Sequence, residues 1–161
     1  LGKKRAHVVI VTKCPSSISK EEQIKIENRL AVKVPVFFSK IKYDDSVYAI
    51  DSEIKLQNLE QDILVVAGIA NPKPFFDFLN AKDVLIFPDH HDFTAEDVKT
   101  ILEKEKGRKI VTTEKDYVRL KDKVVSNQLF YLPIKSEFIS NSTDFDTLIL
   151  DFVNPLVLKS R

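Results

Sequence analysis

Short apolar runs rich in Val, Ile and Phe recur along the chain, and they constrain its fold more than any other feature. Runs of this length, with few polar residues inside them, are typical of strands buried on both faces of a parallel sheet. We expect strands at residues 7–11, 36–38, 63–67, 84–87, 110–112 and 129–132.

The segments between these runs carry helical patterns with recognisable starts. Ser19 stands three residues before Glu22, and Thr94 stands three before Asp97, which is the capping-box spacing. Apolar residues recur three and four positions apart after Thr94, and again from Phe145 onward. This alternation of strand and helix predicts an α/β fold of three layers, α/β/α, around a mostly parallel, Rossmann-like sheet.

The length of the chain favours one domain. A chain of 161 residues, 43% of them hydrophobic, can bury one core, so we expect residues 1–161 to form a single domain. Residues 36–50 break the alternation, because apolar stretches flank Asp44 and Asp45 on both sides. They predict a strand and a β-hairpin that projects from the sheet.

Composition argues against several classes of protein. Lys and Arg number 25 against 24 Asp and Glu, so a net charge of +1 provides no basic field for a nucleic acid. The single cysteine, Cys14, forms no internal disulfide, which fits a reducing cytosol. No apolar stretch approaches the roughly 20 residues of a membrane span. We expect a soluble chain, and the absence of Met indicates a fragment.

Polar residues follow several of the expected strands, at the position where ligands bind in open α/β sheets. Because the carboxyl ends of parallel strands meet at one edge, we expect a shared polar crevice. The clusters are Thr12–Pro15, Gly68–Pro72, Pro88–Asp92 and Thr112–Asp116.

The run from Asp89 to Asp92 is the richest in groups that can carry chemistry. A histidine beside a carboxylate can be held in one tautomer and accept a hydroxyl proton, so His90 and Asp89 are candidate catalytic residues. Two histidines and two aspartates could also bind a metal ion. Alternatively, an Asp or His of this run caps the helix that begins near Thr94.

Thr113, Glu114, Lys115 and Asp116 combine a hydroxyl, two carboxylates and an ammonium group at the end of a strand. In a functional interpretation, Lys115 reaches an anionic phosphate or pairs with Glu114. In a structural interpretation, Thr113 and Asp116 cap the next helix. Both remain open from the residues alone.

Lys13 and Asn71 are further candidates for binding a substrate or phosphate. Lys13 ends the first strand and could face a phosphate or solvent, and Asn71 precedes Pro72, which also suits a turn. Neither a P-loop pattern nor G-x-G-x-x-G occurs in the 161 residues. A self-sufficient P-loop enzyme is therefore excluded.

Four segments, in order, resemble the motifs of tetraacyldisaccharide 4'-kinases and together reach over nearly the whole chain. They are Val9–Lys13, Val66–Phe76, Phe87–His90 and Val111–Asp116. This family transfers the γ-phosphoryl group of ATP to the 4'-hydroxyl of tetraacyldisaccharide 1-phosphate, at the cytoplasmic face of the bacterial inner membrane, to form lipid IVA in lipid A biosynthesis. The resemblance implies that this chain is a C-terminal lobe, and that a missing N-terminal P-loop lobe binds most of the ATP and Mg²⁺. We expect no kinase activity from the chain alone.

The resemblance also implies roles for individual residues. His90 matches a histidine that works with an Asp of the other lobe to take the hydroxyl proton, and Asp89 matches its neighbour. Residues 36–50 resemble a strand pair that hinges the two lobes. Many members lack a second histidine, so His91 is expected to be incidental. Ala70 and Pro74 depart from the Gly and Arg that the family often has, which weakens a ligand role for that turn.

Two other functions stay open. The triplet Asp89-His90-His91 also names a family of metal-dependent phosphoesterases, whose chemistry needs further aspartates to hold two metals. The only Asp-x-Asp in the sequence, Asp144 to Asp146, opens a helical pattern instead. The third possibility is a noncatalytic module that binds substrate.

Overall fold

The computed structural model describes residues 5–124 and 127–154, and the chain divides into two compact units. Unit 1 comprises Leu1–Lys42 and Lys135–Arg161, and unit 2 comprises Tyr43–Ile134. The sequence predicts one domain, whereas the strands form two separate sheets. The expected runs at 7–11 and 36–38 pair with each other and not with the larger sheet, and this is why the chain divides.

Unit 1 is built around a sheet of three strands in the order β1-β2-β9, with β1 parallel to β2. Its elements are β1 (Val9–Val11), α1 (Lys20–Leu30), β2 (Val36–Tyr43), β9 (Ile134–Phe138) and α5 (Ser142–Val153). The predicted capping box at the start of α1 is confirmed, with both reciprocal bonds between Ser19 and Glu22 present. Rings of Phe37, Phe138 and Phe145 pack together at centroid distances of 4.7 to 5.8 Å.

Unit 2 contains a six-stranded sheet in the order β4-β3-β8-β7-β5-β6. Its strands are β3 (Ser46–Ala49), β4 (Ser52–Lys55), β5 (Ile63–Ala67), β6 (Asp83–Ile86), β7 (Lys109–Thr113) and β8 (Leu129–Leu132). Its helices are η2 (Leu56–Asn58), α2 (Lys73–Phe78), α3 (Ala95–Glu105) and α4 (Glu114–Leu120). Strands β5 to β8 are parallel, so the predicted α/β class with a mostly parallel sheet is confirmed.

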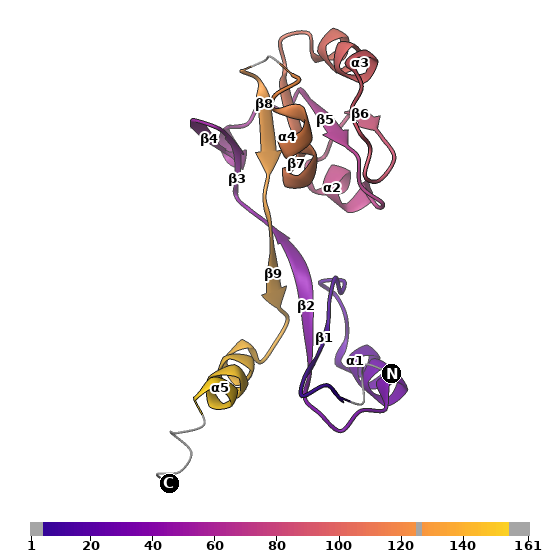
Figure 1. Cartoon of the computed structure of the whole chain (residues 1–161), viewed down its shortest axis with the longest axis vertical. Coiled ribbons are helices and arrows are strands. Elements are labelled where there is room, and N and C mark those ends of the chain that lie inside the picture. The colour runs from indigo at the N-terminus through magenta and orange to yellow at the C-terminus, as the bar shows by residue number, and fades with distance from the viewer. Residues whose placement is uncertain (1–4, 125–126, 155–161) are drawn as a thin grey trace. The chain divides into compact units, whose positions relative to one another are not determined.

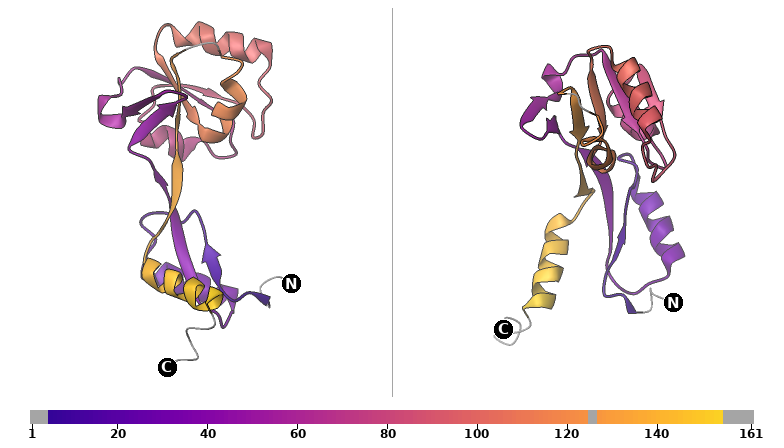
Figure 2. Two further views of the ribbon diagram at one scale, coloured as in Figure 1. Left: turned by 60° about the vertical axis from the view of Figure 1, so that its left-hand side comes forward. Right: turned by 45° about the horizontal axis from the view of Figure 1, so that its top comes forward.

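Helices cover both faces of the unit 2 sheet, because successive residues of each strand point to opposite faces. On one face, Leu64 and Val66 of β5 pack with Ile101 of α3 and Leu120 of α4. On the other face, Val65 of β5 belongs to a second apolar cluster. That cluster includes Val47, Ile63, Ala67, Phe75 of α2, Val111, Phe130 and Leu132. Figures 1 and 2 show the resulting arrangement of sheet and helices within this unit.

The hairpin predicted for residues 36–50 does not form. Strand β2 ends at Tyr43 and pairs with β1 and β9, while β3 pairs antiparallel with β4 and β8. The observed hairpin is therefore β3–β4, in which Ala49 pairs with Ser52. Asp44 and Asp45 lie where the chain passes from unit 1 to unit 2. The hinge role of this segment stays a prediction.

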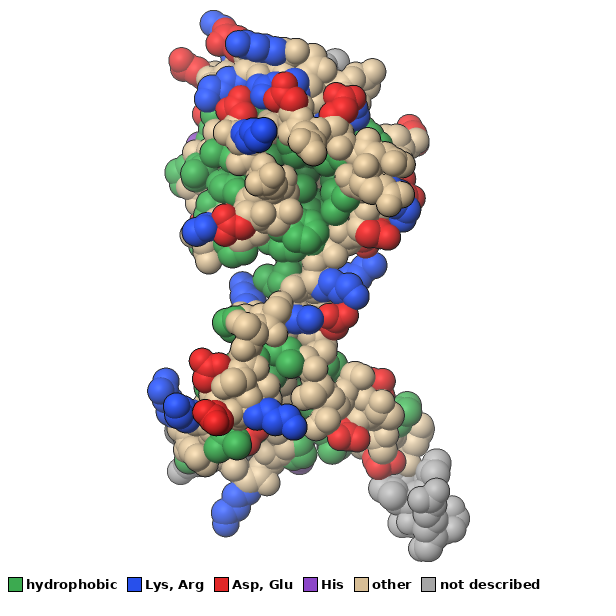
Figure 3. Space-filling model, turned by 180° about the vertical axis from the view of Figure 1, so that it is seen from behind, with side chains coloured by type: hydrophobic (Ala, Val, Ile, Leu, Met, Phe, Trp, Pro, Cys, Tyr) green, Lys and Arg blue, Asp and Glu red, His purple; other side chains and the backbone are tan. Residues whose placement is uncertain are grey.

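The described surface carries both signs of charge. In the space-filling view of Figure 3, Lys and Arg side chains lie interspersed with Asp and Glu side chains on the visible face. Of the helices in the described part of the chain, none has the length and apolar character needed to span a bilayer.

Candidate active site at the carboxyl edge of the unit 2 sheet

The connections that follow the neighbouring strands β5 and β7 lie on opposite faces of the sheet. Helix α2 connects β5 to β6 over one face, whereas α3 and α4 lead back through β7 to β8 over the other. The carboxyl ends of β5 and β7 therefore flank a topological switch point, the usual place for a ligand in open α/β sheets.

Three of the four predicted polar clusters follow strands of this sheet, and the first does not. Thr12–Pro15 follows β1, which pairs with β2 in the sheet of unit 1. The prediction that all four clusters share one edge is wrong for this reason. Lys13 lies in that segment with a left-handed φ of 58° and an exposed side chain.

The carboxylate of Asp116 joins the ends of β5 and β7. Its Oδ2 accepts hydrogen bonds from the backbone N–H of Gly68 at 2.8 Å and from the hydroxyl of Thr113 at 2.7 Å. The hydroxyl of Thr113 in turn accepts from the N–H of Asp116, which confirms Thr113 as the N-cap of α4. Asp116 is fully buried. This geometry favours a structural role for Thr113 and Asp116.

Gly68 has no room for a side chain at this junction. A Cβ at this position would lie 3.2 Å from Asp116 Oδ1 and 3.3 Å from the carbonyl oxygen of Pro88. Both distances are tighter than ordinary contacts with carbon, so the carboxylate approaches β5 closely only because residue 68 is glycine.

Asp89 and His90 lie in the loop between β6 and α3, which we call loop 88–93. Asp89 Oδ1 is 2.7 Å from Lys115 Nζ and accepts the backbone N–H of His90 at 3.0 Å. The hydrogen bond from Lys115 is the main reason that the pKa of Asp89 lies below its ordinary value. The carboxylate therefore stays charged beside the imidazole.

The imidazole of His90 is presented to solvent next to that carboxylate. Its side chain is 74% exposed, and its Nε2 lies 3.7 Å from Asp89 Oδ2. The backbone of His90 has a φ of 60°, the left-handed region that residues other than glycine rarely adopt. An exposed imidazole beside a charged carboxylate can accept a proton from a bound hydroxyl group.

The cap of α3 is Thr94, as its spacing to Asp97 predicts. Thr94 accepts the N–H of Asp97, and Asp97 Oδ2 accepts the N–H of Thr94, so the capping box is complete. The alternative in which Asp89 or His90 caps this helix is therefore wrong. Hydrogen bonds from the Thr94 backbone, His91 and the Thr94 hydroxyl, in decreasing order, lower the pKa of Asp97 to about 2.

His91, expected to be incidental, is anchored in the loop by a polar contact and two ring contacts. Its Nε2 lies 2.9 Å from Asp97 Oδ2, and its ring stacks on Phe87 and meets Phe93 edge-on at centroid distances of 5.1 and 5.2 Å. The spacing of two aromatic residues around His91, with an acid six residues later, could have indicated this. The structure thus divides the two histidines into an anchored one and an exposed one.

The remaining candidates at this edge are exposed. Asn71 lies in the turn between β5 and α2, and Glu114 opens α4. The predicted pairing of Lys115 with Glu114 is replaced by the pairing with Asp89. The edge therefore brings together Asp89, His90 and Lys115, with Asn71 and Glu114 in the neighbouring turns. A ligand role for each of these residues stays a prediction.

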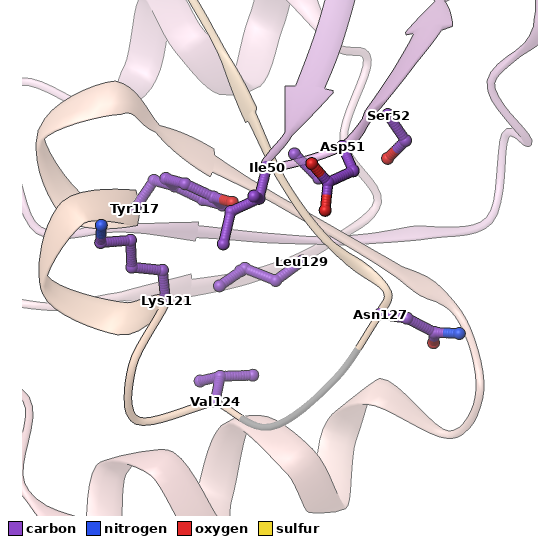
Figure 4. Close-up of a pocket in the computed structure, with 9 residues that line it drawn as sticks. Ile50, Asp51, Ser52, Tyr117, Lys121, Val124, Asn127 and Leu129 are labelled. Atoms are coloured by element: carbon purple, nitrogen blue, oxygen red, sulfur yellow. The ribbon is translucent and has the colours of Figure 1, made fainter.

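A cavity of about 260 Å³ lies at the opposite, amino end of the parallel strands (Figure 4). It is lined by Ala49–Ser52, Tyr117, Lys121, Val124, Asn127 and Leu129. None of the residues predicted from sequence as a site lies among them. The candidate site is thus a surface at the carboxyl edge, separate from this cavity.

A family profile described as tetraacyldisaccharide-1-P 4'-kinase matches residues 2–154. The chain belongs to this kinase family. Among curated relatives, tetraacyldisaccharide 4'-kinase of Flavobacterium johnsoniae is 46% identical over 157 residues, and that of Flavobacterium psychrophilum is 43% identical over 159. Each match includes 94% of this chain and 46% of the relative. The chain therefore spans about half the length of the curated relatives it matches.

A solved structure supports the fold of this family member. The crystal structure of the "apo" form of LpxK from Aquifex aeolicus, in complex with ATP, aligns with 91% of this chain and 42% of that chain. The TM-score is 0.55 and the sequence identity is 20%. At this identity the likeness establishes the fold alone.

Proposed function

We propose that the protein containing this chain transfers the γ-phosphoryl group of ATP to the 4'-hydroxyl of tetraacyldisaccharide 1-phosphate, forming lipid IVA in lipid A biosynthesis. The observation that carries this proposal, beside family membership, is His90. Its imidazole is exposed at the carboxyl edge of a parallel sheet and stands beside a carboxylate held in its charged form. Enzymes of this fold class bind ligands at that edge.

His90 acts as the base for the 4'-hydroxyl in this proposal. Phosphoryl transfer depends mainly on positioning and on neutralising charge, while a nearby base takes the proton of the attacking hydroxyl. An imidazole that gains this proton becomes a cation, and the carboxylate of Asp89 at 3.7 Å stabilises that cation. An Asp from the N-terminal half of the protein works with His90.

ATP and Mg²⁺ belong mainly to the rest of the protein in this proposal. When bound, they supply the phosphoryl group and balance its charge. Within residues 5–124 and 127–154 no three His, Cys, Asp or Glu residues come together in a group that could hold a metal ion. The Asp89 carboxylate is already paired with Lys115. We therefore assign the metal ion to the part of the protein outside this chain.

The partner of unit 1 is the N-terminal half of the same protein. Neither α1 nor α5 contains a buried residue. Large apolar side chains that remain exposed on these helices are Ile24, Ile149, Leu150, Phe152 and Val153, at 39% to 67%. Relatives about twice as long supply a segment that can cover these side chains.

The lipid substrate sets the place of action. We infer that the enzyme works peripherally at the cytoplasmic face of the bacterial inner membrane, where the acyl chains of the disaccharide are anchored. The chain alone is inactive, because it lacks the half that binds ATP. No observation on the described residues favours the phosphoesterase. The isolated chain would then act at most as a module that binds substrate without catalysis.

The test joins this chain to its native N-terminal half and compares His90 with His90→Ala. Loss of a general base is expected to lower kcat by about 10² to 10⁴ with little change in KM. His7→Ala is the matched control, because His7 lies in unit 1 and is expected to leave kcat unchanged. An unchanged kcat in His90→Ala removes the catalytic role of His90, and a joined protein without 4'-kinase activity contradicts the proposed function itself.

A further inference from the structure

Three basic side chains at intervals of four residues, on α4 and the turn after it, hold loop 88–93. We call Lys115, Arg119 and Lys123 the basic ladder. Lys115 Nζ lies 2.7 Å from Asp89 Oδ1, Arg119 Nη1 lies 3.1 Å from the His91 carbonyl oxygen, and Lys123 Nζ lies 2.7 Å from the Phe93 carbonyl oxygen. Lys123 also lies 3.0 Å from Asp92 Oδ1. Lys115, Arg119 and Lys123 thus bind successive parts of the loop.

Residues four apart on a helix lie on one face, so a single face of α4 is directed at the loop. Helix α3 also binds the loop, through the contact between His91 and Asp97. A turn inside the loop adds a hydrogen bond from the His91 N–H to the Pro88 carbonyl oxygen at 3.2 Å. Loop 88–93 is therefore bound by side chains of both α3 and α4.

These contacts support the left-handed backbone conformation of His90. A left-handed φ is disfavoured for a residue with a Cβ and persists only where the surroundings impose it. The residues on both sides of His90 are bound by the ladder, Asp89 through its carboxylate and His91 through its carbonyl oxygen. His90 itself stays 74% exposed.

We infer that Lys115 and Arg119 are positioning residues for His90, acting through Asp89 and through His91 respectively. This inference rests on the proposed function, in which His90 is the base. It gives Lys115 a role different from the phosphate contact that its sequence position suggests, because its ammonium group is already paired within the loop. Lys123 anchors the far end of the loop, away from His90, and contributes less.

The kinetic test uses the joined protein and separates kcat from KM. Lys115→Gln and Arg119→Ala are expected to lower kcat about 10- to 100-fold, the range that a small misplacement of a reacting group produces. KM for the disaccharide changes less than about twofold, because binding in the ground state is not the interaction that is lost. Lys115→Arg and Arg119→Lys restore most of kcat, and Lys121→Ala, on the same helix end, leaves both constants unchanged.

Two results would overturn the inference. A rise in KM at constant kcat for Lys115→Gln would make Lys115 a contact for a substrate anion. An unchanged kcat for Arg119→Ala would make the ladder dispensable for His90.

Hydrogen exchange on the 161-residue chain keeps this inference separate from the proposed function. Arg119→Ala is expected to speed exchange of the His90 and His91 amides, while amides of α3 keep their protection and report an intact fold. If the His90 and His91 amides exchange at the same rate in the wild type and in Arg119→Ala, Arg119 does not hold the loop and the inference is contradicted. If the joined protein lacks 4'-kinase activity, the proposed function fails, and the exchange result still decides whether the ladder fixes the loop.

Discussion

Unit 2 and unit 1 differ in how completely they bury their own apolar side chains. In unit 2, helices on both faces of the sheet complete two apolar clusters, and every residue of β5 is buried. In unit 1, the buried apolar residues are Cys14, Phe37 and Phe38 within the described part of the chain. Unit 2 therefore completes its own apolar core, whereas unit 1 leaves large apolar side chains of α1 and α5 exposed.

The largest effect is expected in the core of unit 2. Ile101 of α3 is fully buried among the apolar residues of the sheet, so Ile101→Ala leaves a cavity and costs about 2–5 kcal/mol of unfolding free energy. The next residue, Leu102, is 38% exposed, and Leu102→Ala is the matched control with a smaller loss. Urea unfolding followed by circular dichroism measures both. Equal losses would mean that α3 does not complete this core.

Removing the buried carboxylate at the switch point is expected to have the next largest effect. Asp116→Ala leaves the Gly68 N–H and the Thr113 hydroxyl without their acceptor and costs about 2–3 kcal/mol. Asp116→Asn keeps an acceptor oxygen and loses less. The same unfolding experiment tests this ranking, and a stability unaffected by Asp116→Ala would remove its structural role.

A smaller effect, which depends on context, is expected on α5. Leu150 is 60% exposed, so Leu150→Ala changes the stability of this chain by less than about 0.5 kcal/mol. In the joined protein the same substitution costs about 1.5–3 kcal/mol, if the N-terminal half covers Leu150. Asp151→Ala is the control on the same helix and is expected to be nearly neutral in both proteins. A loss for Leu150→Ala that is equally small in both contradicts the proposed covering of unit 1.

The smallest effect concerns pH and the capping box of α3. The pKa of Asp97 is about 2 in the folded chain, below the ordinary value of about 3.8. Its contribution to stability is therefore complete above about pH 4 and is lost as the pH falls towards 2. The difference in unfolding free energy between wild type and Asp97→Asn should shrink as the pH falls below about 4. A difference independent of pH down to 2 would contradict the capping geometry.

Much of the fold could be predicted from the sequence because its signals are local. The caps of α1 and α3 depend on residues three apart, and both boxes form as predicted. The expected strands at residues 63–67 and 129–132 coincide with β5 and β8. In each case the hydrophobic pattern or the cap lies within a few residues, where sequence spacing and spatial proximity agree.

The predictions of the fold that the structure does not bear out concern strand pairing, which is set by residues far apart in the sequence. The turn chemistry of Asp44 and Asp45 predicts a hairpin, but the pairing of the strands is set by β1, β9 and β8. The division into two units follows from the same pairing.

The sequence singles out some residues of the candidate site and misses the contacts between them. Asp89 and His90 stand out because they are adjacent and polar after an apolar run. The pairing of Asp89 with Lys115 joins residues 26 positions apart, which meet only because α4 packs against loop 88–93. The left-handed backbone of His90 is indicated by no sequence pattern.

The proposed function is tested most directly by measuring phosphate transfer to tetraacyldisaccharide 1-phosphate by this chain alone and by the chain joined to its N-terminal half. We expect 4'-phosphorylation by the joined protein and none by residues 1–161 alone. Turnover by the isolated chain would contradict the claim that it needs the other half, and a joined protein without activity would contradict the proposed function.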